Sequence, residues 1–188
     1  MIDTISTQRF LYFSIRNKIN ILDFEQWLYN HDELEIIFGE QEYLEFISRD
    51  YASIYAFQET EKQIRKLVNF GMFEQERLIS LLHELNQDQG ITRFLEVIAT
   101  LYDEYCEGYD FLRFIALTFI TTSEEYQEVL RQGNQSFDFK SPVIQEAIRL
   151  LTFFEKKELL IIAEHEYIDN RAEQDKIEMH SINEMFKS

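Results

Sequence analysis

Glycine and proline are scarce in this chain, which has five Gly and one Pro among 188 residues. Turn-rich β-folds and phosphate-binding loops both depend on these residues, whereas helices exclude them from their interiors. Ser141-Pro142 places a capping hydroxyl before a first-turn proline, as helix starts often do. The glycines fall at or near the breaks between periodic segments. We therefore predict an all-α protein, folded as a compact multi-helix bundle or an irregular helical array.

Apolar periodicity and capping signals divide the chain into successive helical segments. Asp23 followed by Gln26 is typical of a capped helix start. The segment 111–122, FLRFIALTFITT, could instead form a buried strand, although no partner strand is evident. We expect a single helical domain over 1–170 and a C-terminal helix or partly ordered tail over 171–188. The expected helices lie near 7–19, 23–38, 40–50, 57–70, 73–86, 91–107, 109–120, 123–132, 142–156 and 158–172.

The composition is that of a folded protein from a reducing compartment. Hydrophobic residues make up 45% of the chain, with 17 Phe and 10 Tyr, which is enough for a substantial core. A single cysteine, Cys106, allows no internal disulfide. No basic stretch followed by an apolar run opens the sequence, and no apolar run approaches the roughly 20 residues that span a bilayer. We therefore expect a soluble, cytoplasmic protein.

Negative charge is concentrated in two stretches that also carry many aromatic residues. Residues 23–50 contain nine acids and one base, and residues 101–130 contain seven acids and one base. Together they contribute -14 of a net charge of -17. Nucleic acids and anionic membranes are poor partners for such a chain, because their phosphates require Lys and Arg. A strongly acidic folded surface is often complementary to a positive one, so a basic protein is the partner we expect.

Sequence motifs for catalysis, cofactors or metals are missing. There is no GxSxG elbow, no glycine-rich nucleotide loop and no HExxH or paired ExxH signature. Acids flank Cys106 and would raise the pKa of its thiol, which makes it unreactive. We therefore expect no cofactor, no metal and no enzymatic activity. The alternative is a metal-dependent helical enzyme. Its only candidate residues for the site are His83 with Glu84 and His165 with Glu164.

The acids and neighbouring tyrosines of the two stretches are the candidate partner-binding residues. If Gly108 does not end a helix, the acids of residues 103–110 gather on one side of it, opposite an apolar stripe. Tyrosine beside acids is a side chain that anchors protein interfaces. The full set is Tyr29, Asp32, Glu33, Glu35, Glu42, Glu45, Tyr102, Asp103, Glu104, Glu107, Tyr109 and Asp110.

Two stretches of the chain carry a family resemblance. They are 23–51, DFEQWLYNHDELEIIFGEQEYLEFISRDY, and 101–117, LYDEYCEGYDFLRFIAL. Their pattern of aromatic and acidic residues resembles that of small acidic bacterial toxin-immunity proteins, over about a quarter of the chain. The resemblance implies a non-enzymatic protein that binds and neutralises a toxin domain, often a cationic nuclease. A helical scaffold or regulatory protein, with a merely solubilising acidic surface and possible self-association, is the main alternative.

Overall fold

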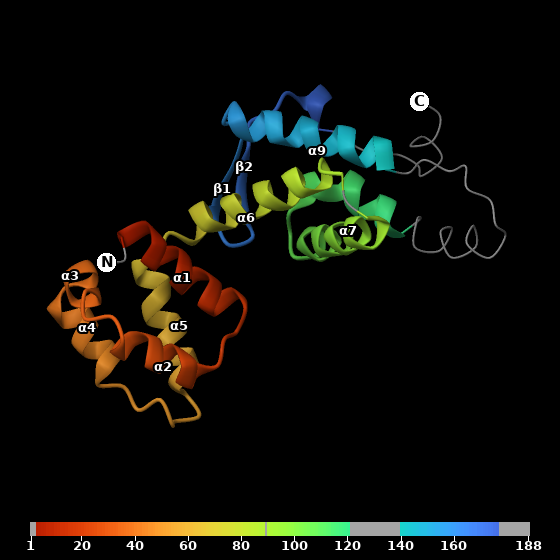
Figure 1. Cartoon of the computed structure of the whole chain (residues 1–188). Coiled ribbons are helices and arrows are strands. Elements are labelled where there is room, and N and C mark those ends of the chain that lie inside the picture. The colour runs from red at the N-terminus through yellow and green to blue at the C-terminus, as the bar shows by residue number, and fades with distance from the viewer. Residues whose placement is uncertain (1–2, 89, 121–139, 177–188) are drawn as a thin grey trace. The chain divides into compact units, whose positions relative to one another are not determined.

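The computed structural model describes residues 3–88, 90–120 and 140–176, and they form two compact units, 1–73 and 74–188 (Figure 1). Each unit has a hydrophobic core of its own. The boundary between the units follows Phe73 and lies inside the helix of residues 70–85. It does not lie in the polar run 86–90 that follows this helix. The single domain expected over 1–170 stays a prediction.

Unit 1 is entirely helical in its described part. Its helices are α1 (Thr4–Arg16), α2 (Ile21–Tyr29), α3 (Leu34–Phe38), α4 (Glu40–Ile47) and α5 (Ala56–Leu67), followed by the start of α6 (Phe70–Leu85). Asp3 caps α1 by accepting a hydrogen bond from the Ser6 N–H at 2.9 Å. Aromatic side chains dominate the core, in which Phe24, Phe46 and Tyr12 are almost completely buried.

The predicted helix 23–38 is wrong in its extent, because the structure breaks it into α2 and α3. Helix α2 begins earlier than predicted, since the side chain of Asn20, not Asp23, caps it by accepting from the Leu22 N–H at 2.9 Å. The helix ends at Tyr29, and His31 Nδ1 lies 2.7 Å from the Trp27 carbonyl oxygen just after that end. Turn residues 32–33 then lead into α3.

Unit 2 is mainly helical and contains a small antiparallel sheet. It comprises most of α6, then α7 (Ile91–Cys106), the 3-10 turn η1 (Asp110–Leu112), α9 (Lys140–Glu155), strands β1 (Leu159–Ala163) and β2 (Glu166–Asp169), and the 3-10 turn η2 (Glu173–Asp175). Helical backbone over 113–120 shows that this part of the ambiguous segment is helix and not strand. The predicted helix 123–132 lies outside the described residues.

The predicted helix 158–172 is wrong, and with it the expectation of a purely α-helical fold. Lys157, with φ of 58°, ends the preceding helix, and His165, with φ of 62°, turns the chain between the strands. Leu159 pairs with Asp169 and Leu160 with Ile168 across the two strands. The side chains of Leu159 and Ile161 point into the core while their neighbours are more exposed, which is the alternation of a half-buried strand.

The C-terminal segment continues from this sheet along α9. Arg149 of α9 donates to the Asp175 carbonyl oxygen at 2.8 Å, so residues 171–176 are held against the helix. Among its described residues, 171–176, η2 is the helical part, and residues 177–188 of the predicted C-terminal helix or tail lie outside the described residues. No helix in the described part of the chain is long and apolar enough to cross a membrane.

Candidate functional site

In unit 1, acidic and tyrosine side chains of α2, α3, α4 and the turn before α3 share one neighbourhood. The Tyr29 hydroxyl lies 3.2 Å from Glu25 Oε1 and 3.4 Å from the Ile47 carbonyl oxygen, which joins α2 to α4. Burial and then the negative charges of Asp32 and Glu35 raise the pKa of Tyr43, so both carboxylates act electrostatically on its hydroxyl group. We call Glu25, Tyr29, Asp32, Glu35 and Tyr43 the α2–α4 face.

Two acids of this face lack a positive partner among the described residues. Asp32 and Glu35 are exposed, and neither forms an ion pair with any described Lys, Arg or His. Their charges therefore remain available to a ligand in solution.

The other predicted acids of unit 1 are engaged within the protein or less accessible. Glu45 lies 3.8 Å from Arg49, and Glu42 is half-buried and accepts a hydrogen bond from Gln63 Nε2 at 3.0 Å. Glu33 is half-buried at the start of α3. Of the predicted carboxylates in this stretch, Asp32 and Glu35 are thus the best placed to meet a partner.

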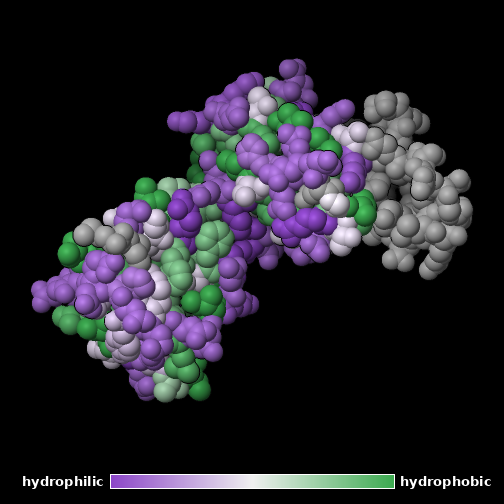
Figure 2. All heavy atoms as spheres, in the orientation of Figure 1, coloured by the Kyte–Doolittle hydropathy of each residue, from purple (hydrophilic) through white to green (hydrophobic). Residues whose placement is uncertain are grey.

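Large apolar side chains are exposed beside these acids. Ile36, the neighbour of Glu35 in α3, is 88% exposed, Leu44 of α4 is 49% exposed, and Tyr29 is 48% exposed. Figure 2 shows hydrophobic residues scattered among hydrophilic ones on the visible face of the molecule. Exposed apolar groups beside unpaired charges are a combination found at protein interfaces, where apolar anchors supply affinity and charges supply steering.

In unit 2, the predicted acidic residues divide into exposed and buried groups. Asp103, Glu107 and Asp110 are exposed and Tyr102 is half-buried. Glu104 and Tyr109 are only 3% and 0% exposed, so the structure contradicts their place on a docking surface. The predicted stripe over 103–110 is broken because α7 ends at Cys106 and Gly108 adopts a φ of 123°.

The buried acid Glu104 belongs to an ionic network that joins α7 to α6. Arg77 Nη2 lies 2.7 Å from Glu74 Oε2 and 2.6 Å from Glu104 Oε2, and the two carboxylate side chains are 0% and 4% exposed. Burial alone would lower the pKa of Arg77, but the hydrogen bonds and charges of both carboxylates raise it above its usual value. The guanidinium is therefore fixed in its charged form between two helices.

Tyr109 is buried beside this network. Burial raises its pKa to about 12, and its hydroxyl oxygen accepts a hydrogen bond from the His165 N–H at 3.0 Å. That bond ties the turn between β1 and β2 to the segment that follows α7. The tyrosine predicted to contact a partner therefore holds the sheet in place instead.

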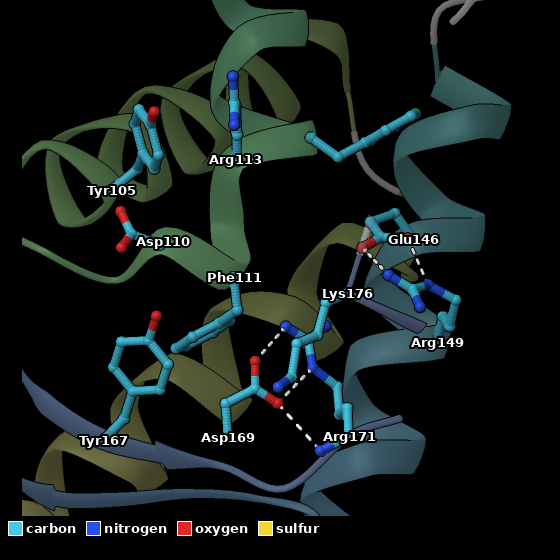
Figure 3. A pocket seen from close by; sticks show the side chains of 11 residues that line it. Tyr105, Asp110, Phe111, Arg113, Glu146, Arg149, Tyr167, Asp169, Arg171 and Lys176 are labelled. Atoms are coloured by element: carbon cyan, nitrogen blue, oxygen red, sulfur yellow. Dashed lines mark hydrogen bonds and ion pairs between the residues drawn. The ribbon is translucent and has the colours of Figure 1, made fainter. Parts of the chain in front are cut away.

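A cavity of about 380 Å³ lies in unit 2 where segments distant in sequence meet (Figure 3). Four aromatic residues line it: Tyr105 of α7, Phe111 of η1, Phe114 of the helical segment 113–120, and Tyr167 of β2. Its basic lining comes from Arg113, Arg149, Arg171 and Lys176, and its acidic lining from Asp110, Glu146 and Asp169. Because these residues come from three separate stretches of the chain, 105–114, 146–149 and 167–176, no local sequence motif indicates the cavity.

Two arginines of this cavity are each held by a carboxylate through a pair of hydrogen bonds. Arg171 donates to Asp169 from Nε at 2.9 Å and Nη2 at 2.7 Å, and Arg149 donates to Glu146 from Nε and Nη2, both at 2.7 Å. Burial raises the pKa of Asp169, but the hydrogen bonds from the Arg171 side chain and backbone outweigh it, so the net shift is downward.

In the described part of the chain, the two histidine–glutamate pairs considered for an enzymatic site are not joined by further metal-ligating side chains. His83 is exposed, and Glu84 instead pairs with Arg93, whose Nη2 lies 3.0 Å from Glu84 Oε2. His165 Nδ1 lies 3.6 Å from Glu107 Oε2. Across the described ranges, no group of three or more His, Cys, Asp or Glu side chains is placed to hold a metal ion.

Comparisons with known protein families, with curated proteins and with solved structures find no match to this chain.

Proposed function

We propose that the protein is a non-enzymatic binding protein that captures a basic partner on the α2–α4 face. The observation that carries the proposal is the pair of exposed acids, Asp32 and Glu35, without a cation beside them, next to the 88%-exposed Ile36. In a chain with a net charge of -17, the field around such a face attracts cations from a distance. Direct contact then buries Ile36 and Tyr29 against the partner.

The partner that fits this face best is a toxin domain with a basic cleft, and the proposed role is that of a cytoplasmic immunity protein. A nuclease cleft must be positive to bind phosphates, so an acidic protein can compete for it. Inhibition requires only shape and charge, because the inhibitor itself performs no chemistry. The sequence resemblance of residues 23–51 to toxin-immunity proteins supports the same role.

Partner capture with matched variants tests the proposal. The immobilised full chain is exposed to extract from its source cells at low salt and at high salt. We expect the wild type to retain a basic protein at low salt only. The variant Asp32→Asn/Glu35→Gln should lose it, and Ile36→Ser should weaken its retention at low salt.

The control variant Glu155→Gln/Glu166→Gln removes the same amount of charge from exposed acids of unit 2. It should retain the partner as the wild type does. Equal loss in both double variants would show that net charge alone governs retention, and the α2–α4 face would then be rejected as the site. Retention of no basic protein at low salt would reject the function itself. Co-expression of a retained partner, with growth as the readout, then separates an immunity protein from other binders.

A further inference from the structure

The cavity of unit 2 plays no part in the proposed capture of a basic partner, and its lining points to the opposite kind of ligand. The chain has 18 Lys and Arg against 35 Asp and Glu, yet four cations and only three carboxylates line this cavity. A volume of about 380 Å³ is within the range of small-molecule sites. Lys176 is paired with Glu173 at 2.7 Å, and Arg149 and Arg171 are paired with Glu146 and Asp169, so the cation of the lining without a described carboxylate partner is Arg113.

The two paired arginines are held rigidly in the cavity wall. Arg171 is only 6% exposed and donates two hydrogen bonds to Asp169. Arg149 likewise donates two hydrogen bonds to Glu146. Arg149 Nη1 donates to the Asp175 carbonyl oxygen at 2.8 Å, and Arg171 Nη1 lies 3.5 Å from the same oxygen. Both guanidinium groups also lie over Phe153, at 5.2 and 5.4 Å from its ring centroid. The two groups are thus fixed close together.

Each of these guanidinium groups keeps donors that its partners do not use. A guanidinium has five N–H groups, of which a bidentate carboxylate takes two and a carbonyl oxygen takes one. Two N–H groups therefore remain on each side chain for an additional acceptor. Because their own carboxylates have oriented them in advance, binding an anion would cost little side-chain entropy.

A third arginine and four aromatic rings complete the lining. Arg113 is exposed, and no described residue forms a hydrogen bond or ion pair with it. Figure 3 shows its side chain set apart from the paired arginines, on another segment bordering the cavity. Phe111 and Tyr167 stand edge to face, with ring centroids 5.1 Å apart and an angle of 78° between the ring planes, and provide an apolar wall beside the charged one. A planar ligand could lie against that wall.

We propose that this cavity binds a small organic anion, in which a planar ring carries a phosphate or carboxylate group. The anionic group would receive hydrogen bonds from Arg113 and from the free N–H groups of Arg149 and Arg171. The ring would pack against Phe111 and Tyr167. Asp110 borders the cavity and disfavours ligands with a higher density of negative charge, such as polyphosphates.

Titration of the full chain, labelled with ¹⁵N, tests this proposal by NMR. The probes are phenyl phosphate and benzoate, with inorganic phosphate and benzyl alcohol as the comparisons that lack the ring or the charge. We expect saturable shifts confined to amides of residues 105–114, 146–149 and 167–176 with phenyl phosphate or benzoate. Inorganic phosphate and benzyl alcohol should bind at least tenfold more weakly. Absence of saturation with both ring-bearing anions would overturn the proposal, and equal binding of inorganic phosphate would overturn the role of the rings.

Matched charge variants locate the site. Arg113→Gln should weaken binding about three- to tenfold and leave the melting temperature unchanged, because Arg113 has no described partner to lose. Lys156→Gln removes an exposed charge from the same unit outside the cavity and should bind as the wild type does. Equal weakening in both would assign the effect to net charge and overturn the proposal. The variant Asp32→Asn/Glu35→Gln should bind these probes normally, so a failure of this site is distinct from a failure of the α2–α4 face.

Discussion

Removal of Arg77 should destabilise unit 2 far more than removal of an exposed arginine that joins the same two helices. In Arg77→Met, Glu74 and Glu104 would stay buried at 0% and 4% side-chain exposure without the cation that lies 2.7 and 2.6 Å from them. Breaking one buried ion pair in this way costs about 3–5 kcal/mol, and the loss of a cation shared by two acids favours the upper end. At about 2–4 °C per kcal/mol, the melting temperature should fall by roughly 10–20 °C.

Arg93→Met is the matched control for this prediction. Arg93 also bridges the two helices, from α7 to Glu84 of α6, but its side chain is 55% exposed. Its replacement should leave the melting temperature nearly unchanged, because water already solvates this pair. Urea and thermal unfolding followed by far-UV circular dichroism measure both variants.

A second substitution separates charge burial from lost packing. If the loss of the Arg77 cation beside two buried acids causes the destabilisation, adding Glu104→Gln to Arg77→Met should recover part of the lost stability, because one buried charge is removed. Similar melting temperatures for Arg77→Met and Arg93→Met, or a further loss in the double variant, would refute the reasoning.

Three further substitutions or titrations give distinct expected outcomes. Gly39 has φ 84° and ψ 155°, a conformation that only glycine adopts readily, so Gly39→Ala should lower the free energy of unfolding by about 1–3 kcal/mol in urea unfolding, and an unchanged midpoint would contradict this. The pKa of Asp169 is lowered in the folded state, so its contribution to stability is present above its unfolded pKa and is lost as the pH falls through its folded pKa. Asp169→Asn should therefore flatten the acid limb of the curve of unfolding free energy against pH. An unaltered limb would count against the pairing with Arg171. Burial raises the pKa of Tyr51 and of Tyr109 to about 12, so both favour folding below pH 10 and lose that contribution as the pH rises toward 12. Absorbance at 295 nm should show at least two tyrosines ionising late in the native protein and one fewer in Tyr51→Phe, and normal titration of all ten would contradict the burial of Tyr51 and Tyr109.

Scarce Gly and Pro, together with periodic apolar residues, predict most of the described helices to within a few residues. The β-hairpin was missed because Leu159–Ala163, LLIIA, has the same apolar content as a buried helical segment. What decides its conformation is Lys157 and His165 in positive φ, and positive φ is uncommon for any residue other than glycine. A short apolar run is therefore decided by its flanking backbone rather than by its own composition.

The candidate sites show where charge patterning stops being informative. Clustering of acids correctly predicts that Asp32, Glu35, Asp103 and Glu107 are exposed. It cannot distinguish Glu104, one helical position after Asp103, which points inward because Arg77 of another helix compensates its charge. The cavity escapes sequence reasoning altogether, because Arg113, Arg149 and Arg171 become neighbours of one space only in the folded chain.

The rate at which the captured basic partner associates with the immobilised chain tests the central claim most directly. Measured by surface plasmon resonance at low and high salt, the wild-type association rate should fall at least tenfold as salt screens the field of the α2–α4 face. Asp32→Asn/Glu35→Gln should show a slower rate at low salt and little further dependence on salt, while Glu155→Gln/Glu166→Gln should follow the wild type. An association rate that is indifferent to salt, or equal in the two double variants, would contradict capture by this face.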